Sequence, residues 1–368
     1  MSKTVLLTAG GTGGHLFPAQ ALAGELGRRG WIVELATDER ADKYGTAFPA
    51  RNVHIISSET IRGRNPVSIA KTLYSLLRGT LQARSVIKSL KPAVVVGFGG
   101  YPTFPPMYAA RLTGTPSILH EANGIMGRAN KMLAKGVNAI ATSIPVNNLP
   151  AELSAKVVET GNPVRDAVVE AAGQPYSAPL EGGAFALLVF GGSQGARFFS
   201  DLVPPAVERL PGEMRNRLKV VQQCRPEDMD RVQKIYEGLG VDAECAPFFK
   251  DMPQRIAASH LVLCRSGASS VSELSILGRP SILVPLPGAI DQDQAANAKV
   301  LETAGGAWPI RQSELNPGRL AEELARFMNA PDQLAVAAEN ARGVAKPDAV
   351  KRLADLVEKV AAQQGERP

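Results

Sequence analysis

The sequence predicts an α/β protein built from two Rossmann-like domains, each a doubly wound parallel sheet. Short apolar runs alternate with longer helical segments along the chain, which is typical of βαβ units. A strand, a glycine-rich loop and a helix also occur twice, because FALLVFGGSQGAR aligns with VLLTAGGTGGHL at an offset of 181 residues. The length of 368 residues suits two domains rather than one.

The first half contains five predicted strands, over residues 4–9, 31–37, 93–98, 116–121 and 139–144. Helices are predicted near residues 18–29 and over residues 66–90. Each predicted strand is short, apolar and bounded by Gly, Pro or polar residues, as expected for strands buried on both faces.

The second half repeats the pattern, with predicted strands over residues 185–190, 218–224, 261–264 and 281–287. Gly and Pro interrupt the pattern in GNPVR, residues 161–165, so we expect domains over 1–163 and 164–342. An amphipathic helix follows Pro347. It is compatible with either domain, and we expect residues 347–364 to pack back on the first.

Composition is that of an ordinary globular protein, with 45% apolar and 21% charged residues. The three cysteines have no CxxC spacing and suggest neither a disulfide framework nor a zinc site. No apolar run approaches the roughly 18 residues of a membrane span, and the N-terminal apolar run is too short for a signal peptide. We therefore expect a cytoplasmic protein.

Charge is unevenly distributed, although the formal net charge is only +6. Residues 60–120 contain eight Lys or Arg and no acid, which indicates an anionic partner: phosphate, nucleic acid or a membrane surface. In the helix predicted there, four apolar residues share a stripe beside Lys71 and Arg78: Ile69, Leu73, Leu76 and Leu77. An anionic membrane surface would explain both features. A crossover helix packing on its sheet explains the leucines but not the missing acids.

Three glycine-rich loops follow predicted strands: GGTGG, GFGGYP and GGSQG. Backbone N–H groups at a helix start bind phosphate, whereas any one such loop is more simply a tight turn. Three together favour anions bound at two places. The dinucleotide fingerprint is not met, because Leu16 stands where its third glycine belongs. A dehydrogenase remains a minor alternative, since Asp38 follows the second strand.

The stretch from residue 264 to 298 contains the most candidate ligand-binding residues. Gly267, Ala268 and Ser269 follow a strand and can present amides to phosphate at a helix start. Glu273 either accepts from both hydroxyls of a ribose or closes an S-x-x-E capping box with Ser270, and spacing alone favours the cap. Four polar residues follow the next strand: Asp291, Asp293, Gln294 and Asn297. They mark either a ligand-binding strand end or a polar loop.

Taken in order, GGTGGHLFPA, GFGGYPTFPP, LHEANGIMGRANK, GNPVR, FGGSQGAR and the SGASSVSEL–DQDQAANA block span nearly the whole chain. This set resembles the MurG family of GT-B glycosyltransferases of bacterial peptidoglycan synthesis. The resemblance implies two domains facing a cleft. It implies inverting transfer of N-acetylglucosamine from UDP-GlcNAc to the C4 hydroxyl of the MurNAc of lipid I, which makes lipid II. It also implies a peripheral enzyme on the cytoplasmic face of the cell membrane, with no cofactor and no nucleic-acid partner.

The resemblance also assigns the binding residues. It implies a UDP-GlcNAc site formed by Thr12, Gly13, Gly14, Asn123, Arg165, Ser193, Phe249, Ala268, Ser269, Ser270, Val271, Ser272, Glu273 and Gln294. It implies that the acceptor diphosphate lies on Gly11, Gly14, Gly99, Gly100 and Tyr101. Glu273 then binds the ribose diol, reversing the interpretation from spacing. Asp293 stands where related sequences often carry Gln, and its role stays open.

An inverting transfer needs a base for the acceptor hydroxyl, positive potential for the leaving diphosphate, and aligned substrates, for which we expect cleft closure. Helix N-termini and Arg165 can supply the potential, so we expect no obligatory metal. Among four histidines, His54 and His260 are interpreted as structural. His15 is predicted to be the base or to orient the acceptor, because the second loop copy has Ala196 there. Glu121 is the rival base, and His120 beside it is expected to face the cleft.

Two alternative functions are closer to the one that the resemblance implies than a dehydrogenase is. A UDP-GlcNAc 2-epimerase shares the GT-B fold but gives no reason for the basic, acid-free stretch. A nucleotide-sugar-binding protein without turnover would bind UDP-GlcNAc but release no UDP when acceptor is added.

Overall fold

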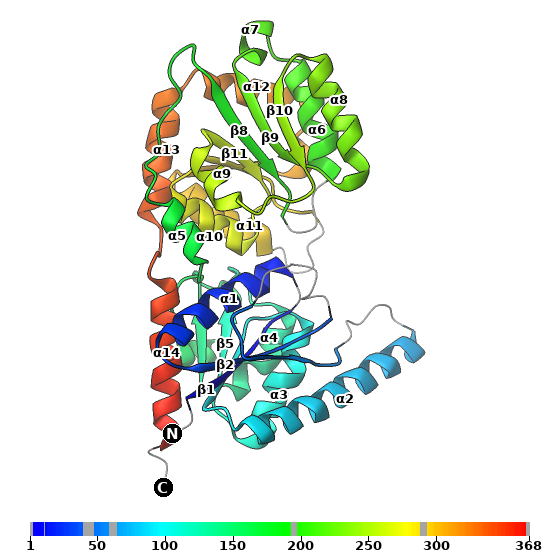
Figure 1. The fold of residues 1–368 in the computed structure, drawn as a ribbon, viewed down its shortest axis with the longest axis vertical. Helices are drawn as coiled ribbons and strands as arrows, with labels where there is room; N and C mark the ends of the chain where they lie inside the picture. The colour runs from blue at the N-terminus through cyan, green and yellow to red at the C-terminus, as the bar shows by residue number, and fades with distance from the viewer. Residues whose placement is uncertain are drawn as a thin grey trace. The chain divides into compact units, whose positions relative to one another are not determined.

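The computed structural model describes residues 3–10, 12–39, 48–58, 65–192, 197–287 and 293–365. The chain forms two compact units, one of residues 1–165 with 347–368 and one of residues 166–346 (Figure 1). Each unit contains one parallel sheet with helices packed on it. The predicted fold class, two Rossmann-like parallel-sheet units, is confirmed.

The first unit has a seven-stranded sheet in the order β3-β2-β1-β4-β5-β6-β7, with every neighbouring pair parallel. Its strands are β1 (Thr4–Thr8), β2 (Ile32–Thr37), β3 (Asn52–Ile55), β4 (Val94–Gly97), β5 (Ser117–Glu121), β6 (Ala139–Thr142) and β7 (Val157–Glu159). The order reverses between β1 and β4. Open α/β sheets bind ligands at such a switch point, beyond the carboxyl ends of the strands.

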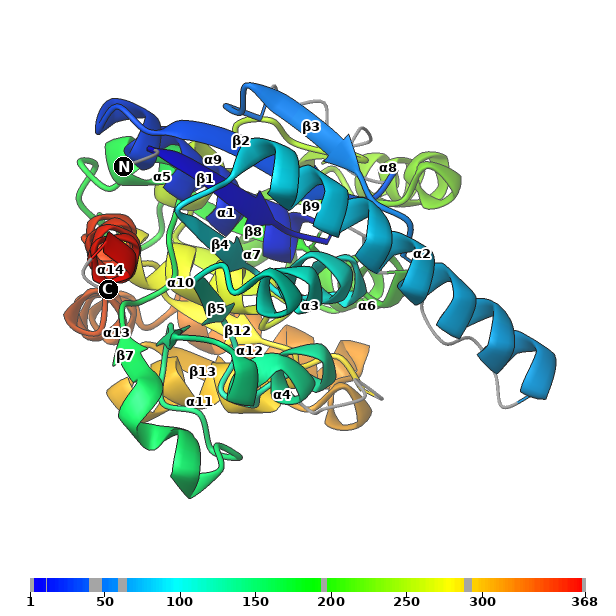
Figure 2. The same cartoon turned by 90° about the horizontal axis from the view of Figure 1, so that it is seen from below.

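Helices cover both faces of this sheet (Figures 1 and 2). They are α1 (Gly13–Arg28), α2 (Pro66–Leu90), α3 (Phe104–Thr113), α4 (Arg128–Leu133) and α14 (Ala349–Gly365), with the 3₁₀ turns η2 (Tyr101–Thr103), η3 (Ala134–Gly136) and η4 (Ala151–Lys156). Side chains alternate along β1, so Val5 and Leu7 join the core under α1 and α14. Leu6 joins the core under α2 and α3.

The terminal helix α14 packs against α1 of the first unit (Figure 1). Arg29 donates to Asp355 at 2.6 Å and to Glu358 at 2.9 Å. The indole of Trp31 also donates to Glu358, at 3.1 Å. These contacts join the end of the chain to its beginning around a shared apolar core.

The second unit has a six-stranded parallel sheet in the order β10-β9-β8-β11-β12-β13. Its strands are β8 (Phe185–Phe190), β9 (Leu218–Gln223), β10 (Asp242–Ala246), β11 (Leu261–Cys264), β12 (Ser281–Leu283) and β13 (Ala307–Pro309). Its helices are α5 (Asp166–Ala171), α6 (Arg197–Glu208), α7 (Gly212–Arg215), α8 (Met229–Gly238), α9 (Met252–Ala258), α10 (Ala268–Leu277), α11 (Asp293–Ala304), α12 (Pro317–Met328) and α13 (Pro331–Gly343), with η5 (Pro226–Asp228) and η6 (Gln312–Glu314). The switch point lies between β8 and β11.

The structure adds four strands that sequence patterns did not predict, and all four are edge strands: β3, β7, β10 and β13. Edge strands are exposed along one side, so they lack the continuous apolar runs of the central strands. The first helix also begins at Gly13, not near Pro18, which lies inside α1. His15 is therefore in the first turn of the helix.

Candidate active site

The switch point of the first unit brings together the loops that follow β1 and β4. The amide of Gly10 donates to the carbonyl of Gly99 at 3.3 Å, which joins the two loops. Thr12 is the N-cap of α1 but makes no side-chain cap hydrogen bond, and Gly14 in the first turn is exposed. The predicted residues Thr12, Gly13 and Gly14 thus form an open helix start, which suits an anion.

His15 is held between these loops in a defined tautomer. Its Nδ1 lies 2.8 Å from the carbonyl oxygen of Phe98. A carbonyl only accepts, so Nδ1 carries the hydrogen, and Nε2 of the neutral ring keeps the lone pair. The imidazole is half-buried. His15, the predicted base, therefore carries its lone pair on Nε2.

Gly99 and Gly100 are required beside this histidine. Their φ angles are +88° and +79°, a region that other residues rarely adopt. A Cβ on Gly99 would lie 3.3 Å from Cε1 of His15, and one on Gly100 would lie 3.2 Å from its Cδ2. The loop that ends at Tyr101 can approach the imidazole only because it lacks side chains there.

His120 is buried rather than open to solvent, contrary to the expectation that it faces a cleft. Burial lowers its pKa to about 4, and repulsion from His15 in its protonated form adds to this effect, whereas a hydrogen bond to the Gly161 carbonyl opposes it. Its Nε2 lies 3.4 Å from that carbonyl oxygen, and its ring is 5.2 Å from that of Phe98. His120 is a neutral packing neighbour of the site.

Glu121 is buried at the end of β5, and all its hydrogen-bond partners are donors. Oε1 accepts from the backbone N–H of Asn123 at 3.1 Å and from its side-chain amide at 3.2 Å. Oε2 accepts from the N–H of Gly127 at 3.0 Å and from Nδ2 of Asn130 at 2.9 Å. Burial raises the pKa of this carboxyl, and these hydrogen bonds oppose the rise. The geometry favours Glu121 as the residue that orients Asn123 and α4.

Sequence patterns missed Asn130, a buried residue of α4 that donates to Glu121. Its Oδ1 is buried without a hydrogen-bond partner in the structure. Buried amide oxygens rarely lack a hydrogen-bond partner. The only signal in the sequence is its place in LHEANGIMGRANK, nine residues after Glu121.

The other two histidines have the structural contacts that were expected of them. His54 Nε2 lies 3.0 Å from Oε2 of Glu34, a buried carboxylate of the neighbouring strand β2. His260 accepts from the backbone N–H of Ala186 through Nδ1, at 2.9 Å. Both contacts tie neighbouring strands together.

The switch point of the second unit lies where β8 and β11 end. Helix α10 begins at Ala268, and its N-cap Gly267 makes no side-chain cap hydrogen bond. Ser266 donates to the Gln294 carbonyl at 2.8 Å, and Asn297 donates to the Ser266 carbonyl at 3.2 Å. The start of α11 is thereby fixed beside the start of α10.

This geometry rules out the capping box that spacing alone favoured. The N-cap is Gly267, so Ser270 is the third residue of the helix and Glu273 lies further along. Ser272 donates back to the Ala268 carbonyl at 2.9 Å instead. Glu273 is buried, and its negative charge helps burial to raise the pKa of the Cys264 thiol.

The remaining predicted donor residues are dispersed over both units. Gln294 accepts from the Leu286 N–H at 3.0 Å. Phe249 is buried, with the Arg255 guanidinium 4.2 Å above its ring. Arg165, the last residue of the first unit, lies 4.1 Å over the ring of Phe17 in α1. Three predicted residues, Gly11, Ser193 and Asp291, lie outside the described residues.

Arg265 is a second residue that sequence patterns missed. It lies between β11 and α10, is buried, and donates to the Val284 carbonyl at 3.2 Å and to Gln312 at 2.7 Å. Burial lowers the pKa of its guanidinium. A buried cation two residues before the N-cap of α10 adds positive potential at that helix start.

Among the described residues, no group of three or more His, Cys, Asp or Glu side chains is arranged to hold a metal ion.

Two family models match the chain. The glycosyltransferase family 28 N-terminal domain matches residues 5–142, and the C-terminal domain of the same family matches residues 186–353.

Curated relatives cover nearly the whole chain. The UDP-N-acetylglucosamine–N-acetylmuramyl-(pentapeptide) pyrophosphoryl-undecaprenol N-acetylglucosamine transferase of Sinorhizobium fredii is 56% identical over 358 residues, which is 97% of this chain and 95% of its own. The protein of that name from Brucella canis is 54% identical over 371 residues, 99% of this chain and 98% of its own.

Solved structures give the same picture of the fold. The crystal structure of Acinetobacter baumannii MurG matches with a TM-score of 0.76 at 29% identity, over 97% of this chain and 99% of its own. A UDP-GlcNAc 2-epimerase from Neisseria meningitidis, bound to UDP-GlcNAc, matches with a TM-score of 0.66 over 97% of this chain and 100% of its own. Its identity is 14%, so that likeness concerns the fold alone.

Proposed function

Because the chain belongs to glycosyltransferase family 28, we propose that it transfers N-acetylglucosamine from UDP-GlcNAc to the MurNAc C4 hydroxyl of lipid I, making lipid II. The observation that carries this proposal is identity of 56% and 54%, over nearly the full length, to two transferases named for that reaction. The proposal is supported by the two switch points, one in each unit, because open α/β sheets bind ligands at such points.

The acceptor is assigned to the first unit. Its diphosphate would lie on the open start of α1 and on Gly99, Gly100 and Tyr101, with the sugar next to His15. Nε2 of His15 takes the C4 hydroxyl proton as that oxygen attacks C1 of the donor sugar. The oxygen attacks from the face opposite the leaving group, so the configuration at C1 inverts. Glu121 supports this step indirectly, since it holds Asn123.

The nucleotide and diphosphate of the donor are assigned to the second unit. The diphosphate would accept hydrogen bonds from the amides at the start of α10, and Glu273 would accept from the ribose hydroxyls. As the C1–O bond breaks, negative charge grows on the departing UDP. The helix N-terminus and the buried Arg265 guanidinium stabilise that charge. We expect turnover to survive chelation of divalent metals.

A membrane surface is proposed as the second partner of the first unit. Four large apolar side chains of α2 are exposed by 58–68%: Leu73, Tyr74, Leu77 and Leu81. Leu73 and Leu77 belong to the predicted stripe, and packing on the sheet does not account for them because they face solvent. Leu76 is half-buried, and the side chain of Ile69 lies outside the described residues. The exposed Lys71 and Arg78 lie on the same helix.

Apolar side chains flanked by cations suit an anionic bilayer surface. Such binding would place the enzyme on the cytoplasmic face of the membrane, beside an acceptor that cannot leave the bilayer. No described helix is both long and apolar enough to cross a membrane.

One assay separates this function from its alternatives. The protein is incubated with UDP-GlcNAc and a lipid I analogue, and UDP, disaccharide and UDP-sugar isomers are measured. The proposal requires UDP and disaccharide in equal amounts. A 2-epimerase would convert UDP-GlcNAc without acceptor, a binding protein would release no UDP, and either result would refute the proposal. The 2-epimerase is not favoured, since its likeness to this chain is one of fold.

A further inference from the structure

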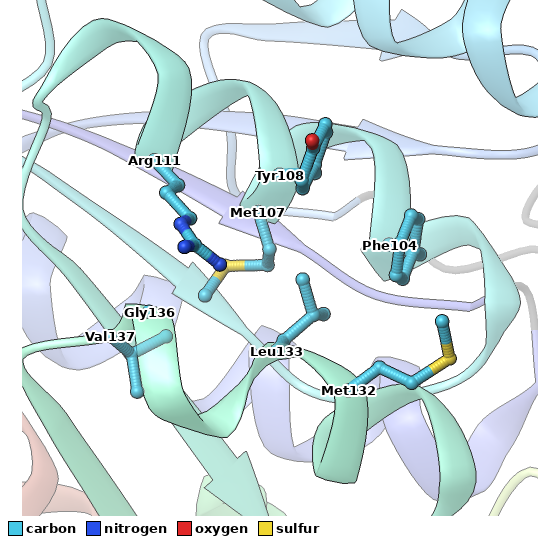
Figure 3. A pocket seen from close by; sticks show the side chains of 8 residues that line it. All are labelled: Phe104, Met107, Tyr108, Arg111, Met132, Leu133, Gly136 and Val137. Carbon is cyan, nitrogen blue, oxygen red and sulfur yellow. The ribbon is translucent and has the colours of Figure 1, made fainter.

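An apolar cavity of about 160 Å³ opens between α3 and α4 of the first unit (Figure 3). Phe104, Met107 and Tyr108 line it from α3, and Met132 and Leu133 face them from α4. Tyr108 is 38% exposed and Met132 is 70% exposed, so the cavity has an apolar rim at the surface. Exposed apolar side chains around a hollow mark a binding site more often than single exposed residues do.

One wall of the cavity is continuous with the loop assigned to the acceptor diphosphate. Phe104, the first residue of α3, comes three residues after Tyr101. The Thr103 hydroxyl donates to the Gly99 carbonyl at 2.6 Å. Met107 packs so closely on β4 that a Cβ on Gly97 would lie 2.9 Å from its sulfur. The loop and this wall therefore form one rigid piece.

The opposite wall is fixed by Glu121. That carboxylate accepts from the N–H of Gly127, the N-cap of α4, and from Asn130 in the first turn of α4. Met132 and Leu133 follow directly on the same short helix. Both walls thus begin at loops that border the proposed acceptor site.

The far end of the cavity is marked by a cation. Arg111 lines the cavity from the last turn of α3, about 10 Å along the helix axis from Phe104. Arg111 is an exposed residue, and its side chain makes no hydrogen bond or ion pair with any residue that the structure describes. The cavity therefore leads from the diphosphate loop towards an unpaired positive charge at the surface.

We propose that this cavity binds the first isoprene units of the acceptor's polyprenyl chain, an inference that rests on the proposed function. A diphosphate held above a bilayer exposes the start of its lipid chain to water, and apolar walls along the path cover it. A cavity of about 150 Å³ lined by apolar side chains holds benzene, so this one has room for a five-carbon unit. Arg111 then faces the phosphates of the surrounding lipids.

The test is calorimetric titration of the full-length protein with farnesyl diphosphate and with inorganic diphosphate. We expect wild type to bind farnesyl diphosphate at least about tenfold more tightly than inorganic diphosphate. Met132→Gln should reduce that preference at least about fivefold and leave the affinity for inorganic diphosphate unchanged. Leu112→Gln is the matched control, because Leu112 is a 52% exposed residue of α3 that does not line the cavity.

Three results would overturn the inference. In the first, wild type would show no preference for farnesyl diphosphate over inorganic diphosphate. In the second, Met132→Gln and Leu112→Gln would lose that preference equally. In the third, Met132→Gln would lose binding to anionic vesicles together with the preference, which would assign the cavity to bilayer phospholipid. Disaccharide formation is measured in parallel. Turnover without farnesyl preference refutes this inference alone, whereas the preference without turnover refutes the proposed function and supports the cavity as a polyprenyl site.

Discussion

At the residue scale, the tautomer of His15 is set by its neighbours. The Phe98 carbonyl fixes the hydrogen on Nδ1, and Gly99 and Gly100 leave room for the ring. Glu121, the rival base, has both carboxylate oxygens engaged by donors from its own loop. A proton acceptor must offer a lone pair to its substrate. The proposed base His15 has that lone pair on Nε2, whereas Glu121 would first have to release Asn123 or α4.

Replacing His15 by Ala should lower kcat about 100-fold to 10,000-fold with saturating acceptor, because the C4 hydroxyl loses its base. The KM for UDP-GlcNAc should change much less than kcat, since the nucleotide and diphosphate of the donor are assigned to the other unit. Steady-state release of UDP measures both. His54→Ala is a control for loss of an imidazole, and near-normal kcat in His15→Ala would refute the assignment.

His120 predicts how stability depends on pH. Its pKa is about 4 in the folded protein and about 6.5 when unfolded, so the unfolded chain binds more protons between these values. Folding stability therefore falls as pH drops from 6.5 towards 4, by about 3 kcal/mol in total from this group. Urea denaturation across this range measures the fall.

The control is His120→Gln, which keeps a polar side chain but does not titrate. The raised pKa of Glu121 acts in the opposite direction, and it is present in both proteins. The difference between the two proteins in the pH dependence of folding stability is therefore the contribution of His120. An equal loss of stability in both would show that His120 is not the group responsible.

At the element scale, each site depends on a helix that starts where a strand ends. Helices α1 and α10 both begin with N-caps that make no side-chain cap hydrogen bond, Thr12 and Gly267. Their amides are left for a ligand or solvent. In α10 the S-x-x-E spacing alone favoured a cap formed by Ser270 and Glu273. The helix begins earlier, at Ala268, so these two residues do not form that cap.

Glu273→Gln should therefore leave helix stability almost unchanged and weaken donor binding. We expect the KM for UDP-GlcNAc to rise about tenfold or more, because one carboxylate oxygen no longer accepts from the ribose. Isothermal titration with UDP and thermal unfolding separate the two effects. A large fall in Tm with unchanged UDP affinity would return Glu273 to a structural role.

Sequence patterns located the central strands well, because residues such as Val94–Gly97 are apolar on both faces. They missed edge strands such as Asn52–Ile55, whose exposed residues carry no such signal. Pro18 displaced the predicted start of α1, since proline favours a first turn but here lies inside the helix. Asn130 and Arg265 escaped notice because their importance comes from contacts across the fold rather than from spacing.

At the scale of the whole molecule, the acid-free stretch of the chain coincides with the proposed membrane surface and with the cavity. The acid-free stretch of residues 60–120 contains α2, with its exposed apolar side chains, and α3, which borders the cavity. The two helices lie side by side (Figures 1 and 2). This surface suits an acceptor that remains in a bilayer while its headgroup reacts.

We expect the protein to sediment with vesicles that contain anionic lipid and to be released as salt rises, because cation–lipid attraction is screened. Leu73→Gln with Leu77→Gln should weaken this binding at least about tenfold while disaccharide formation from a water-soluble acceptor persists. Val336→Gln is a control in the second unit, where Val336 is 56% exposed. Absent or salt-independent binding would refute the membrane proposal.

Inverting transfer to lipid-linked MurNAc is best tested on its product. The protein is incubated with UDP-GlcNAc and a lipid I analogue, and proton NMR of the disaccharide gives the position and configuration of the new bond. We expect a β linkage to C4, with one UDP released per disaccharide. An α linkage, UDP without disaccharide, or a UDP-sugar isomer as the product would contradict it.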